Sequence, residues 1–313
     1  MIIFGPVPSR RLGRSLGINN IPPKLCSYSC VYCQIGRTLK MEIERRAHYK
    51  PEEILSEVDK KIEKAKKAGE PIDFLSFVPD GEPTLDINLG QEIERLKSFG
   101  VKIAVITNAS LIRRPDVRED LAKADLVSLK VDSLREDVWR KINRPHRTLQ
   151  LSAILSGILA FSKDYGGELA TETMLIKDLN DTDTYLREIA DFLKRLGPIT
   201  AYLSIPVRPP SEKWVKPPDE KAVNQAYQIF SRKIDRVEYL TGYEGNAFAF
   251  TGNVEEDLLS ITSVHPMREQ AVREFLEKAG ADWSSIKDLM NRDQIKEVEY
   301  EGEKFYMKKF RME

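Results

Sequence analysis

The sequence predicts an α/β fold in which helices wrap a parallel β-sheet, with a second, smaller unit at the C-terminal end. From about residue 50 onward, short apolar runs rich in β-branched residues alternate with amphipathic helical patterns. Such alternation is typical of parallel sheets covered by helices. A length of 313 residues is enough for one large domain and a small one.

Each expected strand except the last is followed by an expected helix. Pro51 and the two acids after it suit the first turn of a helix, while Gly69 and Gly100 suit the left-handed position that ends one. The expected strands span residues 15–21, 72–78, 101–107, 126–131, 168–176 and 201–207. The expected helices span residues 51–68, 90–99, 116–123, 148–163 and 182–196.

A second unit is expected over residues 251–313. Asn253 can cap a first helix, further helices are expected over residues 266–279 and 284–290, and two strands surround residues 300–303. This order of helix, helix, helix and hairpin resembles a winged helix. Residues 253–313 hold ten Lys or Arg against fourteen Asp or Glu, which disfavours phosphate binding by this unit alone. A packing or partner-binding appendage is the alternative interpretation.

The composition favours a cytoplasmic protein that has no membrane partner. The chain has 49 Lys or Arg and 49 Asp or Glu, so no global field attracts nucleic acid or a membrane surface. No apolar run approaches the length of a membrane span. The first residues form too short an apolar stretch for a signal peptide.

All three cysteines of the chain stand within eight residues, at Cys26, Cys30 and Cys33. Thiolates are soft ligands that suit iron–sulfur clusters, which usually take four of them. Three thiolates can hold three irons of a cubane cluster and leave the fourth iron open to a substrate or cofactor. The spacing therefore predicts a reaction centre more than a site that only stores electrons.

Zinc and disulfides are the alternatives for these thiols. A structural zinc site needs a fourth ligand, which here has to come from His48, His146 or His265, all distant in the sequence. Disulfides leave one of three thiols unpaired and require an oxidising compartment. The close clustering of the cysteines argues against unrelated structural roles.

The cysteine spacing, with Tyr32 directly before the last cysteine, resembles the signature of the radical S-adenosylmethionine (SAM) superfamily. The lead-in over residues 5–17 and the following Gln34–Arg37 resemble one branch, the iron–sulfur oxidoreductases similar to wybutosine-synthesis enzymes. The resemblance covers residues 1–250 and implies a partial (β/α)6 TIM-type barrel. In such barrels, chemistry gathers at the carboxyl ends of the strands.

The resemblance also implies the cofactors and the reaction. A 4Fe–4S cluster held by Cys26, Cys30 and Cys33 binds SAM at its open iron. An external one-electron reductant supplies the electron that splits SAM into methionine and a 5′-deoxyadenosyl radical. That radical abstracts hydrogen from the substrate, while the barrel orients the cofactors.

Several motifs at the expected strand ends are similar to SAM-binding elements of the superfamily. Asp80-Gly81-Glu82 resembles the Gly-Gly-Glu turn, which offers carbonyls and a carboxylate to the methionine ammonium; an ordinary Asp-Gly turn is the alternative. Asn108 follows the expected strand over residues 101–107 and resembles a residue that faces SAM. Tyr32 is expected beside the cofactors.

The next strands add polar residues that we expect to face the cofactor. Ser128, Lys130 and Asp132 alternate onto one face of a strand, and Ser128 or Asp132 is expected to meet the SAM ribose or carboxylate; Asp132 can instead cap the next helix. Glu172 stands among residues expected to be buried, where an unpartnered carboxylate is unfavourable. We therefore expect it to bind the ribose or the ammonium.

The last barrel strand and the loops carry the remaining candidates. Ser204 and Ile205 are expected beside adenine, while Arg208 and Arg144 suit the SAM carboxylate or an anionic substrate, because guanidinium binds such groups with two donors. His146 follows Arg144 and is either a substrate contact or a loop histidine without a ligand.

Arginines before the first of these strands predict a basic approach to the barrel. Arg10, Arg11 and Arg14, together with Lys24 and Arg37, are expected to give its mouth positive charge. A phosphate-bearing substrate such as tRNA suits this arrangement. The alternative is that these arginines pair with carboxylates of neighbouring loops.

With no further cysteine, the chain cannot hold a second cluster by thiolates. We therefore expect a single-cluster enzyme, with nucleotide or tRNA modification as the leading function. A maturase or activase that acts on a protein or peptide is the first alternative. A redox-sensing regulator that uses the cluster and the C-terminal unit is the second.

Overall fold

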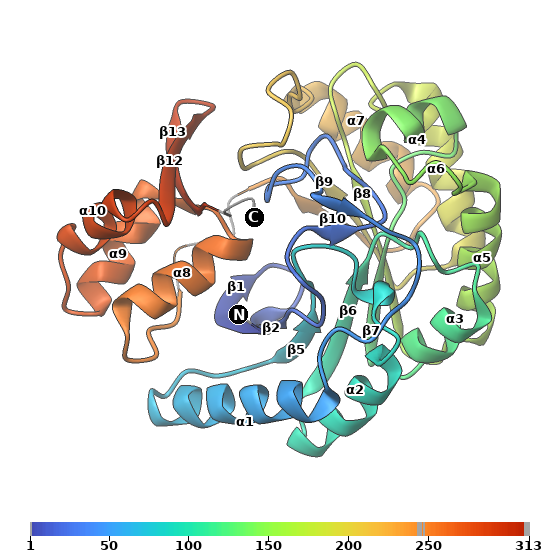
Figure 1. Cartoon of the computed structure of the whole chain (residues 1–313). Helices are drawn as coiled ribbons and strands as arrows, with labels where there is room; N and C mark the ends of the chain where they lie inside the picture. The colour runs from blue at the N-terminus through green and yellow to red at the C-terminus, as the bar shows by residue number, and fades with distance from the viewer. Residues whose placement is uncertain (1, 243–245, 247, 310–313) are drawn as a thin grey trace.

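The computed structural model describes residues 2–242, 246 and 248–309 of the chain. Residues 310–313 of the expected second unit lie outside the described residues. Figure 1 shows an open barrel of strands wrapped by helices, with the C-terminal elements beside it.

A curved sheet forms the centre of the molecule. Within the described residues it has eight strands, in the spatial order β1, β2, β5, β6, β7, β8, β9 and β10. Neighbours are parallel throughout, except that β1 is antiparallel to β2. Because β1 and β10 are the two edges, the barrel is open on one side. The strands are β1 (Ile3–Ser9), β2 (Gly13–Ile18), β5 (Phe74–Phe77), β6 (Lys102–Thr107), β7 (Leu126–Lys130), β8 (Glu168–Met174), β9 (Thr200–Ser204) and β10 (Val237–Leu240).

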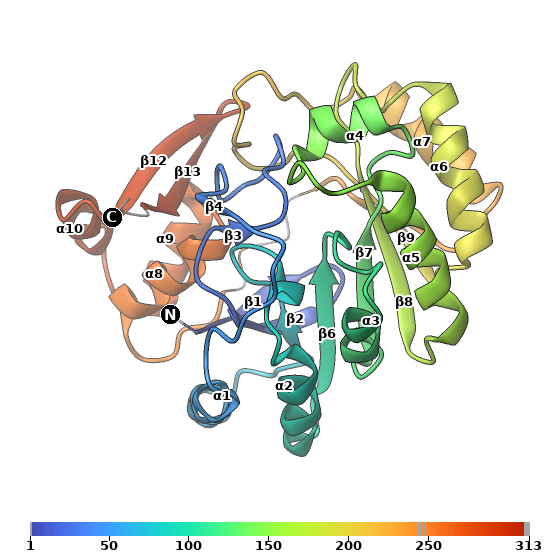
Figure 2. The same ribbon diagram turned by 45° about the vertical axis from the view of Figure 1, so that its right-hand side comes forward.

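Helices alternate with the parallel strands and cover the outer face of the sheet, as Figure 2 shows for α2, α3, α5 and α6. None of the described helices is both long and apolar enough to cross a membrane. The helices of this part are α1 (Pro51–Lys67), α2 (Leu89–Leu96), α3 (Pro115–Leu121), α4 (Glu136–Asn143), α5 (Leu151–Asp164), α6 (Asp183–Leu196) and α7 (Glu220–Ser231). Two short 3₁₀ turns, η1 (Pro83–Leu85) and η2 (Lys97–Phe99), complete it.

The expected strands and helices of the barrel are all present, with ends that differ by a few residues. Gly69 and Gly100 have φ angles of 68° and 67°, as expected after α1 and η2. Strands β1 and β10 and helices α4 and α7 were not among the expected elements. Pro6 and Pro8 argue against a strand, but β1 is a sheet edge, where missing N–H groups are tolerated.

A short two-stranded sheet carries the cysteine motif. β3 (Leu25–Cys26) pairs in parallel with β4 (Lys40–Met41). Residues 26–36, called here the cysteine loop, begin with the last residue of β3 and lead toward β4. The amide of Lys24 donates to the carbonyl of Asp80, which follows β5, at 2.5 Å. The loop therefore lies at the carboxyl ends of the strands.

The C-terminal elements follow the expected order of three helices and a hairpin, with one extra short strand. Oδ1 of Asn253 accepts a hydrogen bond from the amide of Glu256 at 3.1 Å and so caps the first helix, as expected. The likeness to a winged helix stays a prediction. The elements are α8 (Val254–Val264), β11 (Met267–Arg268), α9 (Glu269–Lys278), α10 (Ser284–Asn291), β12 (Ile295–Tyr300) and β13 (Glu303–Lys308), with β13 central in the sheet.

These C-terminal elements have an apolar cluster apart from the main core, but strand β1 contributes to it. Phe4 and Val7 pack there with residues such as Phe248, Leu258 and Phe275. Burying large apolar side chains stabilises such contacts by roughly 1.5–3 kcal/mol for each side chain. The C-terminal elements are thus fixed beside the open edge of the barrel.

Candidate functional site

All three cysteines border one cavity. Cys26 ends β3, Cys30 and Cys33 follow in the cysteine loop, and all three are free thiols. The cavity has a volume of about 350 Å³ and is also lined by residues at or near the ends of β5 to β9. Its charged lining residues are Arg10, Arg11, Lys24, Arg37, Asp80, Glu82, Lys130, Glu172 and Arg208.

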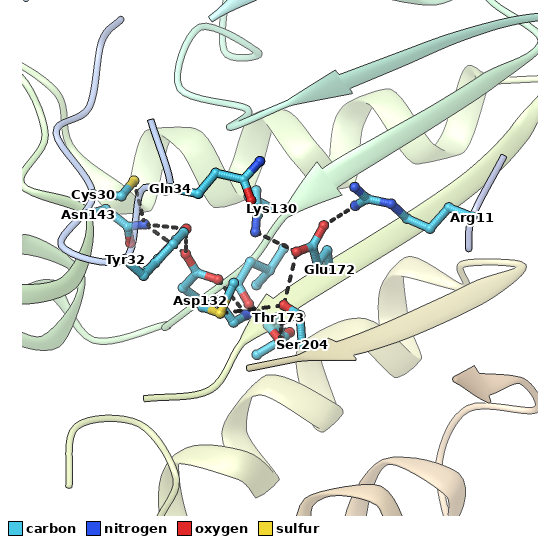
Figure 3. A network of polar contacts seen from close by, with 12 residues as sticks. Arg11, Cys30, Tyr32, Gln34, Lys130, Asp132, Asn143, Glu172, Thr173 and Ser204 are labelled. Atoms are coloured by element: carbon cyan, nitrogen blue, oxygen red, sulfur yellow. Dashed lines mark hydrogen bonds and ion pairs between the residues drawn. The ribbon is translucent and has the colours of Figure 1, made fainter. Parts of the chain in front are cut away.

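Two asparagine side chains donate hydrogen bonds to cysteine sulfurs. Nδ2 of Asn108, directly after β6, lies 3.5 Å from Sγ of Cys26. Nδ2 of Asn143, the last residue of α4, lies 3.5 Å from Sγ of Cys30 (Figure 3). Such N–H donors favour the thiolate over the thiol, and hydrogen bonds of this kind tune metal centres that thiolates hold.

The environment of the thiols fits a metal cluster. Burial raises the pKa of Cys30 to about 12 and also raises the pKa values of Cys26 and Cys33. Coordination to iron reverses this effect, because a bound cation deprotonates a thiol. Among the described residues, no three His, Cys, Asp or Glu side chains converge on a single metal ion. The thiolates of a cubane each bind a different iron, so they need not converge.

The turn after β5 passes against the start of the cysteine loop. The amide of Glu82 donates to the carbonyl of Leu25 at 3.1 Å. A Cβ atom on Gly81 would lie 1.9 Å from that same carbonyl oxygen. Glycine is therefore required at this position by the close approach of two backbones, which explains the motif in physical terms.

Donors of the chain hold the carboxylate of Glu82. Its Oε1 accepts from the hydroxyls of Thr84 and Thr107 at 2.6 and 2.5 Å, and its Oε2 accepts from the amide of Asn108 at 2.8 Å. Burial raises its pKa, although these donors oppose the shift. Glu82 thus holds Asn108 beside Cys26, and the expectation that its carboxylate accepts from the SAM ammonium stays a prediction.

Asp80, in the same turn, has a carboxylate oxygen that can accept a hydrogen bond from a ligand. Its side chain lines the cavity and is buried, and its Oδ1 has no hydrogen-bond partner among the described residues. Burial raises the pKa of Asp80 to about 7, although the charges of Lys308 and Lys24 oppose the shift. A buried oxygen without a donor is unfavourable, so a ligand with an N–H donor suits this position.

Tyr32 and Asp132 bind each other. Oδ2 of Asp132 accepts from the Tyr32 hydroxyl at 2.5 Å and from Nδ2 of Asn143 at 2.7 Å, while Oδ1 accepts from the amide of Met174 at 2.9 Å (Figure 3). Asp132 does not line the cavity and does not cap α4, whose N-cap is Arg135. Both expectations for Asp132 are thus corrected, because its carboxylate anchors the cysteine loop.

Ser128 and Lys130 share one face of β7, as the alternation predicts. Lys130 lines the cavity, but Ser128 is buried without lining it, and its hydroxyl has no partner among the described residues. The expected contact of Ser128 with the cofactor is therefore not supported.

Glu172 has two cationic partners from the chain. Its carboxylate pairs with Arg11 and accepts from Nζ of Lys130 at 2.7 Å and from the hydroxyl of Ser204 at 2.9 Å (Figure 3). Burial alone would raise its pKa, but the charges of Arg11 and Lys130 hold it well below the ordinary value. This buried carboxylate does have polar partners, as expected, but side chains of the protein itself supply these partners.

The end of β9 reaches the cavity and the C-terminal elements. Ser204 and Ile205 both line the cavity. Arg208, just beyond them, donates to Oε1 of Gln34 at 2.7 Å, and its Nη2 lies 2.9 Å from Nε2 of His265. Its guanidinium is thus already engaged next to the cysteine loop.

The expected basic approach is not one surface. Arg11 pairs with Glu172 inside the barrel, and Arg14, at the amino end of β2, pairs with Glu70. Arg10 lies in the same β1–β2 turn as Arg11 and lines the cavity. For Arg11 and Arg14 the alternative reading, pairing with carboxylates, is the observed one.

Arg144 and His146 lie outside the cavity lining. Nη1 of Arg144 donates to Glu212 at 2.5 Å, and Nδ1 of His146 lies 2.9 Å from the hydroxyl of Thr148. Both residues follow α4 and border the outer side of the cysteine loop, since the amide of His146 donates to the carbonyl of Ser27 at 2.8 Å.

Sequence reasoning missed residues that complete the site. Asn143 reaches Cys30, and nothing in a single sequence marks it. Gln34 donates to the carbonyl of Val264 at 2.8 Å, and both Val264 and His265 line the cavity. The motif after the last cysteine was a signal for Gln34, but the contribution of α8 to the cavity depends on a contact across some 230 residues.

The family model described as the Radical SAM superfamily matches residues 20–193 of the chain. A UPF0026 protein of Methanocaldococcus jannaschii is 52% identical over 98% of this chain and 96% of its own length. An S-adenosylmethionine-dependent nucleotide dehydratase of Flammeovirga pacifica is 22% identical over 90% of this chain and 89% of its own length.

Among solved structures, a structure of TYW1 with a lysine-pyruvate adduct bound resembles this fold. The TM-score is 0.54 at 16% sequence identity, and the match covers 71% of this chain and 74% of that one. The likeness supports the partial TIM-type barrel that the open sheet of Figure 1 displays.

Proposed function

Because the chain belongs to the radical SAM superfamily, whose enzymes use a 4Fe–4S cluster and SAM, we propose that it abstracts hydrogen from a nucleotide, with a nucleotide of tRNA as the leading substrate. Cys26, Cys30 and Cys33 would hold the cluster. When bound, the cluster and SAM supply reductive cleavage of the sulfonium to methionine and a 5′-deoxyadenosyl radical that takes a hydrogen atom from the substrate.

The observation that carries the proposal is the convergence of three thiols on one cavity, with an amide donor directed at two of them. Asn108 and Asn143 would stabilise negative charge on the sulfurs and so raise the reduction potential of the centre. Tyr32 and Asp132 would keep the cysteine loop in place.

The lining of the cavity supports a SAM site next to the thiols. Asp80 is suited to accept a hydrogen bond from the SAM ammonium, since its Oδ1 has no partner among the described residues. Lys130, held by Glu172, is suited to orient an anionic group nearby. We propose that the residues around SAM are Tyr32, Asp80, Gly81, Glu82, Asn108, Glu172, Ser204, Ile205 and Arg208.

The charge of the cavity supports a phosphate-bearing substrate. Six Lys or Arg side chains line it, against three carboxylates, and guanidinium and ammonium groups are the common protein ligands of phosphate. A relative named as a nucleotide dehydratase agrees with this substrate class.

The proposal is tested by anaerobic reconstitution of the protein with iron and sulfide, followed by reduction with dithionite in the presence of SAM. We expect a cluster spectrum, formation of 5′-deoxyadenosine, and faster formation of that product when unfractionated tRNA is added. All three should depend on the cysteine thiolates. Cys30→Ala should lose the cluster spectrum and the product, whereas the exposed-site variant Lys163→Ala should keep both.

Two results would change the assignment. Formation of 5′-deoxyadenosine that a peptide or protein stimulates, and tRNA does not, would move the substrate to the maturase class. A fully loaded cluster that yields no product with any of these partners, but controls DNA binding, would favour the regulator.

A further inference from the structure

Three exposed apolar side chains stand in segments that adjoin the cysteine loop. Among the described residues, six large hydrophobic side chains are exposed, and three of them are Leu39, Met41 and Trp214. Leu39 and Met41 come a few residues after the cysteine loop, and Trp214 belongs to the connection between β9 and α7. Trp214 is 49% exposed although it is among the residues that most favour burial or an interface.

Hydrogen bonds bring the segments of this region together. The hydroxyl of Ser211 donates to the carbonyl of Cys30 at 3.0 Å. The carboxylate of Glu212 accepts from Nε of Arg37 at 2.9 Å and from Nη1 of Arg144 at 2.5 Å. Residues 37–41, 144–147 and 211–216 are therefore neighbouring segments beside the cysteine loop, and together they are called here the rim.

The rim is strongly basic in a chain whose overall charge is balanced. Its three segments contain six Lys or Arg and one acidic residue, Glu212, against 49 of each sign in the whole chain. Glu301, at the tip of the C-terminal hairpin, adds one carboxylate by pairing with Lys216 at 3.1 Å. Arg37 is nevertheless 68% exposed in its side chain.

The rim joins the cavity. Arg37 and Thr38 belong to the rim and also line the cavity that holds the three thiols. Figure 2 shows the segment that follows β3 beside the connection after β9 and close to the hairpin of β12 and β13. A partner that lies on the rim can therefore reach into the cavity with one of its groups.

We propose that the rim binds single-stranded RNA, with Trp214 stacked on an unpaired base and Arg37, Lys40 and Lys213 facing phosphates. This inference rests on the proposed function and locates its RNA contact away from the arginines before β2. An exposed flat ring among cations is the pattern by which proteins hold unpaired nucleotides. An acidic electron-donor protein also suits positive charge, but it gives no comparable reason for the exposed indole.

The test measures binding of labelled unfractionated tRNA to the reconstituted protein at several salt concentrations. Trp214→Ala should weaken binding about tenfold or more, as the loss of a base-stacking contact does. The double variant Lys40→Glu with Lys213→Glu should weaken it further and make the salt dependence shallower by about one to two units of slope.

Matched controls are available at the amino ends of the strands. Ile199→Ala removes another exposed apolar side chain, and Lys163→Glu reverses another exposed lysine; both should bind tRNA as the natural chain does. SAM cleavage without RNA should be unchanged in all variants, so that loss of the proposed function is distinguished from loss of the RNA surface.

Equal tRNA binding by the natural chain and the rim variants would overturn the inference. So would unchanged tRNA binding combined with slower reduction of the cluster by an acidic electron-donor protein, since the rim would then dock the donor. Reduction by dithionite, which needs no docking surface, is the reference for that comparison.

Discussion

The hydroxyl of Tyr32 donates a 2.5 Å hydrogen bond to Oδ2 of Asp132, and this contact joins the cysteine loop to the exit of β7. The same oxygen accepts from Asn143, whose side chain also donates to Cys30. The aromatic residue of the cysteine motif thus has a structural task in this chain. It holds the loop against the barrel through a carboxylate that is itself buried.

Replacing Tyr32 with Phe should loosen the cysteine loop. The change removes one hydrogen bond to a buried carboxylate, which costs about 1–3 kcal/mol in unfolding free energy. We expect faster loss of the cluster spectrum under a chelator, measured by absorbance, with a lowered urea midpoint. Tyr227→Phe is the control, since among the described residues its hydroxyl donates no hydrogen bond and its ring stacks on Tyr239. Equal behaviour of the two variants would show that the contact with Asp132 is unimportant.

Glu172→Gln should destabilise the barrel and change its response to acid. The substitution leaves Arg11 and Lys130 without their carboxylate, and breaking a buried ion pair in this way costs about 3–5 kcal/mol. Because the pKa of Glu172 in the fold is lowered, its stabilising effect is present above the unfolded pKa of about 4.3 and is lost as the pH falls below it.

The unfolding free energy of this variant is measured from about pH 3 to about pH 8, in steps of about one pH unit. The natural chain should lose stability more steeply on the acid side than Glu172→Gln does. Glu168→Gln, in the same strand but with its carboxylate half exposed beside Lys102, should follow the natural chain closely. Parallel pH profiles for all three proteins would contradict the assignment.

Local patterns carried much of the fold and part of the site. The alternation of apolar runs and helical stretches predicted the parallel strands, and the spacing of Cys26, Cys30 and Cys33 predicted one shared site. Gly81 was predicted from a motif, and the close approach of its backbone to Leu25 gives the physical reason. These features are encoded over a few residues, so a single sequence reveals them.

Pairings between distant segments were beyond reach of the sequence. Burial predicted that Glu172 needs partners, but Arg11 lies 161 positions away and competes with many other cations. Asp132 satisfied the pattern of a strand facing the cavity, yet Tyr32 and Asn143 occupy its carboxylate. Such choices are made by packing of the whole barrel, which no local pattern describes.

Gly81→Ala should disrupt the site more than its size suggests. The added Cβ would lie 1.9 Å from the carbonyl oxygen of Leu25, so the turn and the cysteine loop must move apart. The nearest atom belongs to the backbone and cannot turn aside as the end of a side chain can, so we expect a loss of about 2–4 kcal/mol together with poor cluster assembly. Iron content after reconstitution and the urea midpoint measure the two effects. Gly166→Ala is the control, because a Cβ added there has no atom of a non-neighbouring residue within 4 Å, and it should behave as the natural chain.

A buried acid pair, Asp86 and Glu92, follows the turn that carries Glu82, and it predicts a pH dependence opposite in sign to that of Glu172. Asp86 ends η1 directly after that turn, and its carbonyl accepts from Nη2 of Arg45 at 2.8 Å. Asp86 and Glu92 are both fully buried. Burial raises the pKa of each, and the neighbouring carboxylate of Asp86 raises that of Glu92 further. At neutral pH the pair therefore keeps a proton.

Glu92→Gln should make the protein more stable in alkali and leave it nearly unchanged in acid. A carboxyl whose pKa is raised in the fold stabilises fully below its unfolded pKa of about 4.3, and that stability is lost as the pH rises through the folded value, by at most about 1.4 kcal/mol per pH unit. Glutamine keeps the shape of the side chain and stays neutral. Urea unfolding at about pH 5, 7 and 9 should therefore show that the variant becomes more stable than the natural chain as the pH rises. Glu94→Gln, an exposed neighbour paired with Lys123, should give no such crossing. A variant that loses stability equally at every pH would mean that Glu92 is ionised and paired in the fold.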